Sequence, residues 1–519
     1  MTQDIIIIGA GLGGLVCGAA LSSVGKKVLV LEKHHSIGGY LQGFTRGQWH
    51  WNIGTHYIGD ADSSGTFPRL MNALLGGRVV FHRLDEHYEC IVTDGYRHDV
   101  VANRDDVYLR LLQREFPSEE KHLAAFFKLL KKMRRRLGLL LAPKLFTGPW
   151  KHLAHAVTRA VFLKYWNKTV QDILDRYFAD AKLKMLLAVH CDKTIMRPDE
   201  ASFLSWLMIQ NSYQDGACYP EGGGEAITNA LKETIVAGGG AVHTGKGVRR
   251  IRLNGKRIAG VMLENGDVLD CNKVVSDIGI LETAERLMPE GRTSPGQRIV
   301  VERYKPSGAF MTLHVGFEGD ITPFGIRNAN YRIMGEAPYD FTKNPLSEEW
   351  QPANLLISFP SMRDQSHSDT LHHTAEILVP VLFSHFDRWA ETKVNQRGED
   401  YSKHKERITG KLLALLDRTF PGIGSFVAFT NLSTPLSYNY YTGHKKGAAY
   451  GLASRVGRST DLNLHPASDI KGLYYTGADS LSHGITGAFM SGIFTAVALS
   501  GKFSIFTLKH AIPNESGSL

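Results

Sequence analysis

The sequence predicts an α/β protein built around a parallel β-sheet, and three observations support this. The apolar run at residues 5–8 has the length of a buried strand, and a glycine-rich turn leads from it into an apolar, alanine-rich helix at residues 15–24. Residues 27–31 then return as a second apolar strand. Near the other end of the chain, a short strand at residues 473–475 leads through several glycines into an apolar helix at residues 488–499. This order of strand, turn, helix and strand is typical of a Rossmann-like dinucleotide-binding domain.

The turn after the first strand has the sequence G-x-G-x-x-G over residues 9–14. Gly9 allows a tight turn, Gly11 lets the backbone approach a pyrophosphate, and Gly14 lets the helix pack closely on the strand. The helix amino terminus offers free N–H groups and the positive end of its dipole to phosphates. Glu32 ends the second strand about 20 residues downstream, where a carboxylate accepts hydrogen bonds from a ribose. We therefore predict dinucleotide contacts from Gly9, Gly11, Leu12, Gly13, Gly14 and Glu32.

Two further segments favour FAD over NAD as the dinucleotide. A second glycine pair follows the second strand, and in two-domain flavoproteins such a segment wraps the other side of the diphosphate. The strand near the carboxy terminus ends in Gly-x-Asp at residues 477–479, which would place a carboxylate near the ribityl chain. The next helix can direct N–H groups at the flavin pyrimidine edge, where negative charge grows on reduction. These segments add Lys33, Gly38, Gly39, Tyr40, Gly477, Asp479, Ile485 and Ala488 to the predicted contacts.

Segments spread over nearly the whole chain resemble one group of FAD-dependent enzymes. They are GTHYIG at residues 54–59, YPEGG at 219–223, FPS at 359–361 with Trp389 and RGEDY at 397–401, TPL at 434–436 and GAAYG at 447–451. On these segments the chain resembles the phytoene desaturases, carotenoid cis–trans isomerases and retinol saturases, and it is most similar to the retinol saturases. It departs from their pattern at Tyr40, where many relatives carry Arg or Ser, and at Asn52, which replaces a common Asp.

The resemblance implies an FAD-dependent oxidoreductase whose substrate is a long apolar polyene, such as a retinoid, a carotenoid or an unsaturated lipid. It also implies that the backbone of Val248 binds the adenine. The similarity to the retinol saturases implies, as the principal interpretation, saturation of a C=C bond by hydride transfer from flavin N5. A flavin enzyme mainly has to position its substrate in a dry pocket. The alternatives are a redox-neutral cis–trans isomerase that uses reduced FAD, a carotenoid desaturase, and a non-catalytic FAD-bound lipid carrier.

Three residues are candidates for proton transfer to or from the substrate. His56 lies in the segment that passes beside the flavin ring in the resembling family, and His483 precedes the carboxy-terminal helix. Imidazole exchanges protons near neutral pH, whereas Tyr57 is the weaker candidate. The sequence contains no G-x-S-x-G, no metal-ligand cluster and no second dinucleotide fingerprint for NAD(P)H. We therefore expect no metal, and either a separate electron donor or a net reaction that is redox-neutral.

The motifs divide the chain into two discontinuous domains, as its 519 residues and 43% apolar content allow. Residues 1–65, 215–280 and 439–512 are predicted to form the FAD-binding domain. Its middle segment reads as a strand and an antiparallel meander, with hairpin turns at two Asn-Gly pairs. Residues 66–214 and 281–438 are predicted to form an α+β substrate domain, which includes a basic helical lobe.

Residues 121–170 form this basic lobe, with eight Lys, four Arg and no Asp or Glu in a chain of net charge +9. Phe126, Leu130, Met133 and Leu137 recur there at helical spacing, with basic residues largely between them. A basic amphipathic segment with aromatic residues docks on anionic bilayers by apolar burial and charge attraction. We therefore expect a membrane-facing surface rather than a stripe packed on the protein's own core, and no nucleic acid partner.

The five cysteines are scattered and lack C-x-x-C spacing, which argues against a disulfide framework and a zinc site. No cleavable signal or transmembrane span is predicted, because the two long apolar segments are explained by the nucleotide-binding motifs. We expect a cytoplasmic protein that associates peripherally with a membrane.

Overall fold

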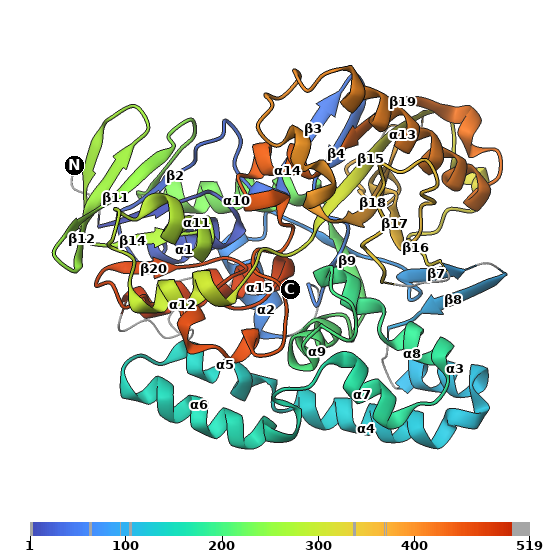
Figure 1. The fold of residues 1–519 in the computed structure, drawn as a ribbon, viewed down its shortest axis with the longest axis horizontal. Coiled ribbons are helices and arrows are strands. Elements are labelled where there is room, and N and C mark those ends of the chain that lie inside the picture. Colours follow the sequence, from blue (N-terminus) through green and yellow to red (C-terminus); the bar gives the residue numbers. More distant parts are fainter. Residues whose placement is uncertain are drawn as a thin grey trace, which may run out of the picture.

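The computed structural model describes residues 4–61, 65–93, 95–102, 106–335, 339–367, 369 and 371–500, so residues 501–512 of the predicted FAD-binding segment lie outside the described part. Figure 1 shows three parts: a parallel sheet with its helices, a seven-stranded sheet beside it, and a layer of helices along the lower edge. The mixed α/β architecture agrees with the prediction.

The parallel sheet has the order β10-β2-β1-β14-β20, and β1 is its central strand. The strands are β10 Ala241–His243, β2 Val28–Leu31, β1 Ile5–Ile8, β14 Val274–Ser276 and β20 Leu473–Tyr475. Side chains alternate between the two faces of a strand, so Ile5 and Ile7 contact a helical core while Ile6 and Ile8 contact a second core. The apolar run at residues 5–8 is therefore buried on both faces, as predicted.

Helices cover one face of this sheet and a meander covers the other. The helices are α1 Leu12–Ser22, α2 Thr66–Leu75, α10 Gly223–Ala237 and α15 Gly484–Ser500. The meander consists of β11 Val248–Asn254, β12 Arg257–Leu263 and β13 Val268–Asp270, which pair antiparallel as predicted. Helix α15 begins at Gly484, four residues before the predicted start at residue 488. Gly484 and Gly487, which were expected to precede the helix, therefore belong to it.

The seven-stranded sheet has the order β19-β15-β18-β17-β16-β7-β8. Its strands are β19 Val427–Ser433, β15 Ala309–Glu318, β18 His372–Val381, β17 Leu355–Ser358, β16 Asn330–Ile333, β7 Glu89–Thr93 and β8 Tyr96–Val100. One face packs against α13 (Glu399–Thr419) through residues such as Leu313, Ile377 and Leu412. Alternation therefore turns the intervening residues of β15, β17 and β18 to the opposite face, which lines the site described below.

Smaller elements connect the two large sheets. Strands β5 (Ile58–Gly59), β9 (Ala217–Pro220) and β6 (Phe81–Arg83) form one antiparallel sheet, and β3 (Gly43–Arg46) pairs with β4 (Trp49–Asn52). Further helices are α11 (Ile280–Glu282), α12 (Pro295–Arg303) and α14 (Pro435–Thr442). The predicted domain limits remain a prediction, although all strands of the parallel sheet fall within the segments assigned to FAD binding.

The helical layer contains the basic lobe. Its helices are α3 Val107–Glu115, α4 Glu120–Arg134, α5 Leu137–Leu145, α6 Pro149–Phe162, α7 Val170–Tyr177, α8 Ala181–Leu187 and α9 Phe203–Ser212. The expectation that the apolar stripe of α4 faces a membrane is wrong. Phe126, Leu130 and Met133 are buried in the core of this layer, because α7 and α9 pack against them.

Helix α6 instead presents an apolar face to solvent. Trp150, Leu153 and Val157 are 66%, 55% and 48% exposed, and their spacing places them on one side of the helix. Phe146, just before the helix, is 48% exposed. Lys144 does not contribute to the surface charge: it is buried, and its Nζ donates hydrogen bonds of 2.9 Å to the carbonyls of residues 461 and 464.

Candidate active site

The glycine turn at residues 9–14 has no room for side chains. A Cβ on Gly11 would lie 2.5 Å from the Asp277 carboxylate, and one on Gly13 would lie 2.5 Å from the backbone N of Gly477. A Cβ on Gly14 would overlap the carbonyl oxygen of Gly9, whose φ of +98° itself favours glycine. Gly11 is also the N-cap of α1, and no described side chain caps this helix. The positive end of the α1 dipole therefore faces this turn, where the buried Asp277 carboxyl lies beside the N–H groups of Gly11 and Gly14.

Glu32 lies beside this turn at the end of β2. Its carboxylate accepts hydrogen bonds from the backbone N–H of Ala10 at 2.9 Å and of His34 at 2.8 Å. Each carboxylate oxygen can accept a second bond, so Glu32 keeps the capacity to bind a ribose hydroxyl. Two other predicted contacts, Lys33 and Val248, do not line the cavity described below. Lys33 is exposed and approaches Gly443, whereas Val248 is buried and begins β11.

The second glycine pair lies alongside the first turn. The N–H of Gly38 donates to the carbonyl of Ala10 at 2.7 Å, and Gly38 and Gly39 both have positive φ. Next to them, the phenol of Tyr40 donates to the carbonyls of residues 447 and 448, and its ring stacks on Tyr438. Tyr40 thereby joins the amino-terminal and carboxy-terminal segments of the chain.

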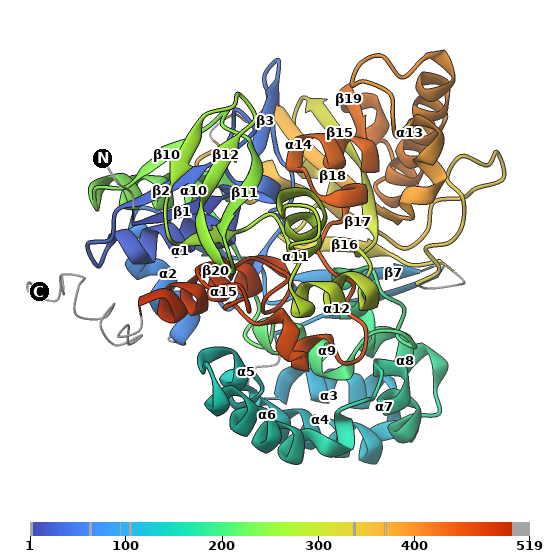
Figure 2. The same cartoon turned by 60° about the vertical axis from the view of Figure 1, so that its left-hand side comes forward.

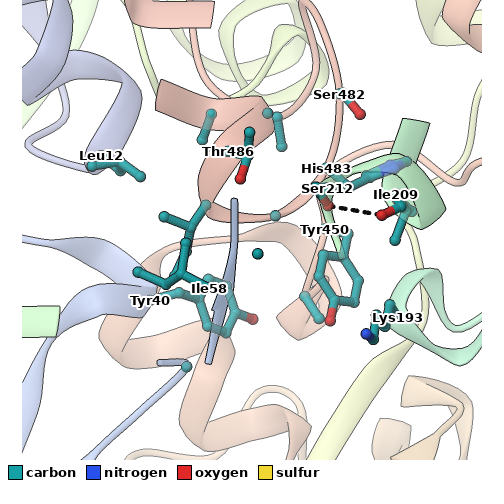
Figure 3. A pocket seen from close by; sticks show the side chains of 18 of the residues that line it. Leu12, Tyr40, Ile58, Lys193, Ile209, Ser212, Tyr450, Ser482, His483 and Thr486 are labelled. Carbon is teal, nitrogen blue, oxygen red and sulfur yellow. Dashed lines mark hydrogen bonds between the residues drawn. The ribbon is translucent and has the colours of Figure 1, made fainter. Parts of the chain in front are cut away.

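A single cavity of about 420 Å³ begins at the glycine turn and extends between the two large sheets. Figure 3 shows it from close by, with Leu12 and Tyr40 at one side and Lys193 at another. Nine of the predicted cofactor contacts line it: Gly11, Leu12, Gly13, Gly38, Gly39, Tyr40, Gly477, Ile485 and Ala488. All three predicted proton-transfer residues line it too, and its apolar walls include Met208, Ile209, Phe310, Leu356, Leu378 and Pro380.

Asp479 lies behind this lining rather than in it. Its carboxylate accepts hydrogen bonds from the backbone N–H of Ile280 at 2.9 Å and of Leu452 at 2.8 Å. It thus supports the backbone of Gly477, Ala478 and Gly451, which do line the cavity. Its predicted contact with the cofactor remains a prediction.

Asp277 is a cavity residue that the sequence analysis did not assign to the site. It follows β14 at the carboxyl edge of the parallel sheet, under the glycine turn. Burial raises the pKa of Asp277 to about 8. A carboxyl group that is largely protonated at neutral pH does not repel a phosphate bound at the turn.

His56 is the best-placed of the three proton-transfer candidates. It lines the cavity, and its Nδ1 lies 2.9 Å from Oε2 of Glu376, although the two atoms are not aligned as a hydrogen bond. Glu376 is fully buried in β18, on the face of the sheet that carries Leu378 and Pro380. Burial first, and then the charge of His56, lower the pKa of the neighbouring His314 to about 3, so His314 stays neutral.

The other two candidates are more constrained. His483 is buried, and its Nε2 lies 2.9 Å from the carbonyl of Leu452, to which it donates. Burial and then Arg458 hold the pKa of His483 well below its usual range, so the ring is neutral. Tyr57 donates to the carboxylate of Glu89 at 3.4 Å. Burial and then Glu89 hold the pKa of Tyr57 well above its usual range, so its phenol keeps the proton.

Beyond Tyr57, the cavity ends at a group of buried charges that the sequence analysis missed. Arg332 donates to Glu89 with its Nε at 2.6 Å and also pairs with Asp192. The Nζ of Lys193 lies 3.7 Å from Oε2 of Glu89 and 3.4 Å above the ring of Tyr213. Asp192, Lys193, Arg332 and Tyr213 line the cavity. One signal was available: Glu89, Arg332 and Glu376 are charged residues next to apolar residues of strands, and a charge that is buried in a sheet has to be paired.

A profile described as flavin containing amine oxidoreductase matches residues 12–500. The chain belongs to this family.

Within the family, the chain is similar over most of its length to two relatives of known activity. All-trans-retinol 13,14-reductase of Danio rerio is 26% identical, over 94% of this chain and 84% of the relative. The chloroplastic prolycopene isomerase of Daucus carota is 22% identical, over 95% and 79%. Among solved structures, putrescine oxidase bound to putrescine superimposes with a TM-score of 0.65 at 15% identity, covering 97% of this chain and 100% of that one. The predicted resemblance to the retinol saturases and carotenoid isomerases is confirmed, and the fold is of the FAD-binding amine oxidase type.

This member of the family is an FAD-dependent oxidoreductase, and its residues fit the cofactor. The glycine cradle, the uncapped start of α1 and Glu32 form a dinucleotide site at one end of the cavity. Ile485 and Ala488 also line this cavity, and they lie in the first turns of α15. The amino terminus of a helix carries a partial positive charge, so it can stabilise a negatively charged group of the cofactor. Among the described residues, no group of His, Cys, Asp or Glu could hold a metal ion, and no helix is long and apolar enough to cross a membrane.

Proposed function

We propose that this enzyme reduces a C=C bond of a conjugated polyene lipid. The observation that carries the proposal is the continuity of the cavity, which joins the dinucleotide site to an apolar chamber between the two sheets. The relative at 26% identity is named for reduction at the 13,14 bond of all-trans-retinol, which is a polyene of this kind. Bound FAD supplies the hydride transfer.

The residues of the chain have three tasks in this reaction. Apolar side chains of the seven-stranded sheet, including Phe310, Leu356 and Leu378, hold the polyene and exclude water. His56 delivers a proton to the carbon next to the one that receives the hydride. Glu376, whose Oε2 lies 2.9 Å from Nδ1 of His56, holds the imidazole in place.

The electrons come from a separate donor in this proposal. The sequence has one strand, glycine turn and helix of the dinucleotide-binding type, and FAD occupies it. The donor then has to reduce the flavin before each polyene is turned over.

Redox-neutral cis–trans isomerisation is the second candidate, favoured by the similarity to prolycopene isomerase. An anaerobic titration of the chemically reduced protein with polyenes separates the candidates when flavin absorbance and product mass are followed together. Reduction predicts that the flavin regains its oxidised spectrum and that the product is heavier by two hydrogens. Isomerisation leaves the flavin reduced and the mass unchanged. A desaturase would instead bleach oxidised flavin and release a product lighter by two hydrogens, and a lipid carrier would change neither.

We further propose that this protein is cytoplasmic and docks on an anionic membrane through α6, from which the polyene enters. The exposed Trp150, Leu153 and Val157 supply the apolar face. The exposed Arg159 and Lys164 flank it with positive charge. Apolar insertion and attraction to anionic lipids reinforce each other at such a surface.

A further inference from the structure

The buried charges at the far end of the cavity are balanced. Glu89 and Asp192 face Lys193 and Arg332, while burial and then Lys193 hold the pKa of His190 well below its usual range, so that ring is neutral. Burial alone would raise the pKa of Glu89, but Arg332, Lys193 and His190 outweigh it and lower the pKa to about 2. The group therefore carries two negative and two positive charges.

Among the described residues, Oε2 of Glu89, both ring nitrogens of His190 and two further atoms of this group lack a hydrogen-bond partner, and only those last two atoms belong to side chains that line the cavity. One is the Nζ of Lys193, a donor that lies 3.7 Å from Glu89, beyond hydrogen-bond length. The other is Oδ1 of Asp192, an acceptor whose neighbouring Oδ2 pairs with Arg332. Both residues line the cavity, and they are adjacent in the chain. Buried polar atoms without partners are costly, so a spare donor and a spare acceptor that line the same cavity indicate a ligand group that satisfies both.

We propose that this end of the cavity is a subsite for a terminal hydroxyl group of the substrate. The Nζ of Lys193 donates to the hydroxyl oxygen, and the hydroxyl hydrogen is donated to Oδ1 of Asp192. In Figure 3 the side chain of Lys193 reaches toward the pocket on the side where Tyr450 lies. The inference rests on the proposed function, and it selects polyene alcohols from among the polyenes that this enzyme could reduce.

The charge balance distinguishes a hydroxyl from other end groups. A hydroxyl is both a donor and an acceptor and leaves the buried group neutral. A carboxylate would bring a third negative charge into a buried site and could not donate to Asp192. A hydrocarbon end would leave the atoms of Lys193 and Asp192 unpaired.

Equilibrium binding to the FAD-loaded enzyme tests the subsite with four ligands of one skeleton. These are all-trans-retinol, its methyl ether, its carboxylic acid and the parent hydrocarbon, measured by polyene absorbance after equilibrium dialysis. We expect the alcohol to bind on the order of 10- to 100-fold more tightly than the hydrocarbon, with the ether between them because it only accepts. Equal affinities for alcohol, ether and hydrocarbon, or a preference for the acid, would overturn the proposal without any variant.

Variants then assign the effect to Lys193. Lys193→Met removes the donors and should cost the alcohol on the order of 10-fold or more in affinity while the hydrocarbon changes less than about twofold. Lys193→Gln keeps an N–H donor and should lose less. Lys403→Met is the matched control, since Lys403 is 70% exposed, pairs with Glu399 on α13 and does not line the cavity. An equal loss for alcohol and hydrocarbon in Lys193→Met would mean that Lys193 only supports the fold.

The same protein samples distinguish this inference from the proposed function. Product heavier by two hydrogens with no alcohol preference would sustain the reduction and reject the subsite. An alcohol preference that depends on Lys193, without any change in product mass, would sustain the subsite and reject the reduction.

Discussion

At the scale of single residues, the pairing of His56 with Glu376 shows how a buried strand prepares a proton-transfer group. Strand β18 is apolar except near its start, and alternation turns Glu376 to the cavity face together with Leu378. A fully buried carboxylate needs a compensating partner, and the imidazole of His56 lies 2.9 Å away. Of the two predicted histidines, His56 is therefore the one whose ring lies beside a buried carboxyl group at the cavity wall.

Glu376→Gln should slow reoxidation of the reduced flavin by polyene about 10- to 100-fold, because the protonated imidazole loses its partner. The pH profile of that rate should move toward acid, which a purely structural role would not cause. Rapid-mixing absorbance under anaerobic conditions measures both, and His56→Ala should slow the reaction at least as much while FAD stays bound. Asp369→Asn, which removes the exposed partner of His372, is the matched control. Unchanged rates in both variants would remove the pair from the mechanism.

At the scale of elements, the basic lobe shows that amphipathic spacing identifies a buried face without identifying what buries it. The stripe of α4 has the pattern of a membrane-binding helix, but α7 and α9 cover it. The neighbouring helix α6 exposes Trp150, Leu153 and Val157 instead. Lys144, counted with the surface charges from sequence, ties α5 to the carboxy-terminal segment. The three helices therefore differ in what they contact: α4 packs on the core, α5 is tied to the carboxy-terminal segment, and α6 presents apolar side chains to solvent.

Replacement of Trp150, Leu153 and Val157 together by Ser should reduce binding to anionic vesicles about 10-fold or more, since each apolar side chain contributes about 1.5–3 kcal/mol when buried. Co-sedimentation with vesicles containing phosphatidylserine is the measurement, and vesicles of neutral lipid test the charge contribution. Neutralising Lys131, Lys132, Arg134, Arg135 and Arg136 should weaken binding less if α6 is the contact. Full binding by the triple variant would show that α6 does not dock.

The pH dependence of stability should report on Lys144. Burial lowers its pKa to about 7 in the folded protein, whereas the unfolded chain retains an ordinary value near 10.5. Between these values the unfolded state binds more protons, so Lys144 makes the folded state more stable as pH rises, by up to about 1.4 kcal/mol per pH unit. Urea unfolding of the wild type and Lys144→Met at pH 7 and pH 9 should show the gap widening in favour of the wild type. A constant gap would contradict this, and Lys403→Met is the control because Lys403 is 70% exposed on α13.

At the scale of the whole molecule, the cavity exists because the two sheets and the helical layer meet around it. Figure 2 shows the parallel sheet and the seven-stranded sheet side by side, with the helical layer beneath them. The glycine turn and the start of α15 contribute to one wall, and strands β15, β17 and β18 contribute to another. A cofactor bound there touches segments from both ends of the chain.

Removal of FAD should therefore lower the hydrogen-exchange protection of several segments that are far apart in the chain. Hydrogen exchange of the apo and FAD-loaded protein should show lost protection in residues 9–14, 38–41 and 477–488, while α13 on the outer face of the seven-stranded sheet changes little. Mass spectrometry of peptides from both forms is the measurement. Lost protection confined to residues 9–14 would mean that the cofactor does not extend along the cavity.

The dinucleotide-binding unit, the meander and the cofactor could be predicted from the sequence, because they depend on local requirements. A turn without room for Cβ atoms needs glycine, and strands buried on both faces need continuous apolar runs. Only the tertiary structure decided which apolar face meets solvent and which charges meet in the cavity. Glu89, Asp192, Lys193 and Arg332 come from three segments far apart in the chain. Their meeting depends on the packing of whole sheets and helices, which no local pattern of residues specifies.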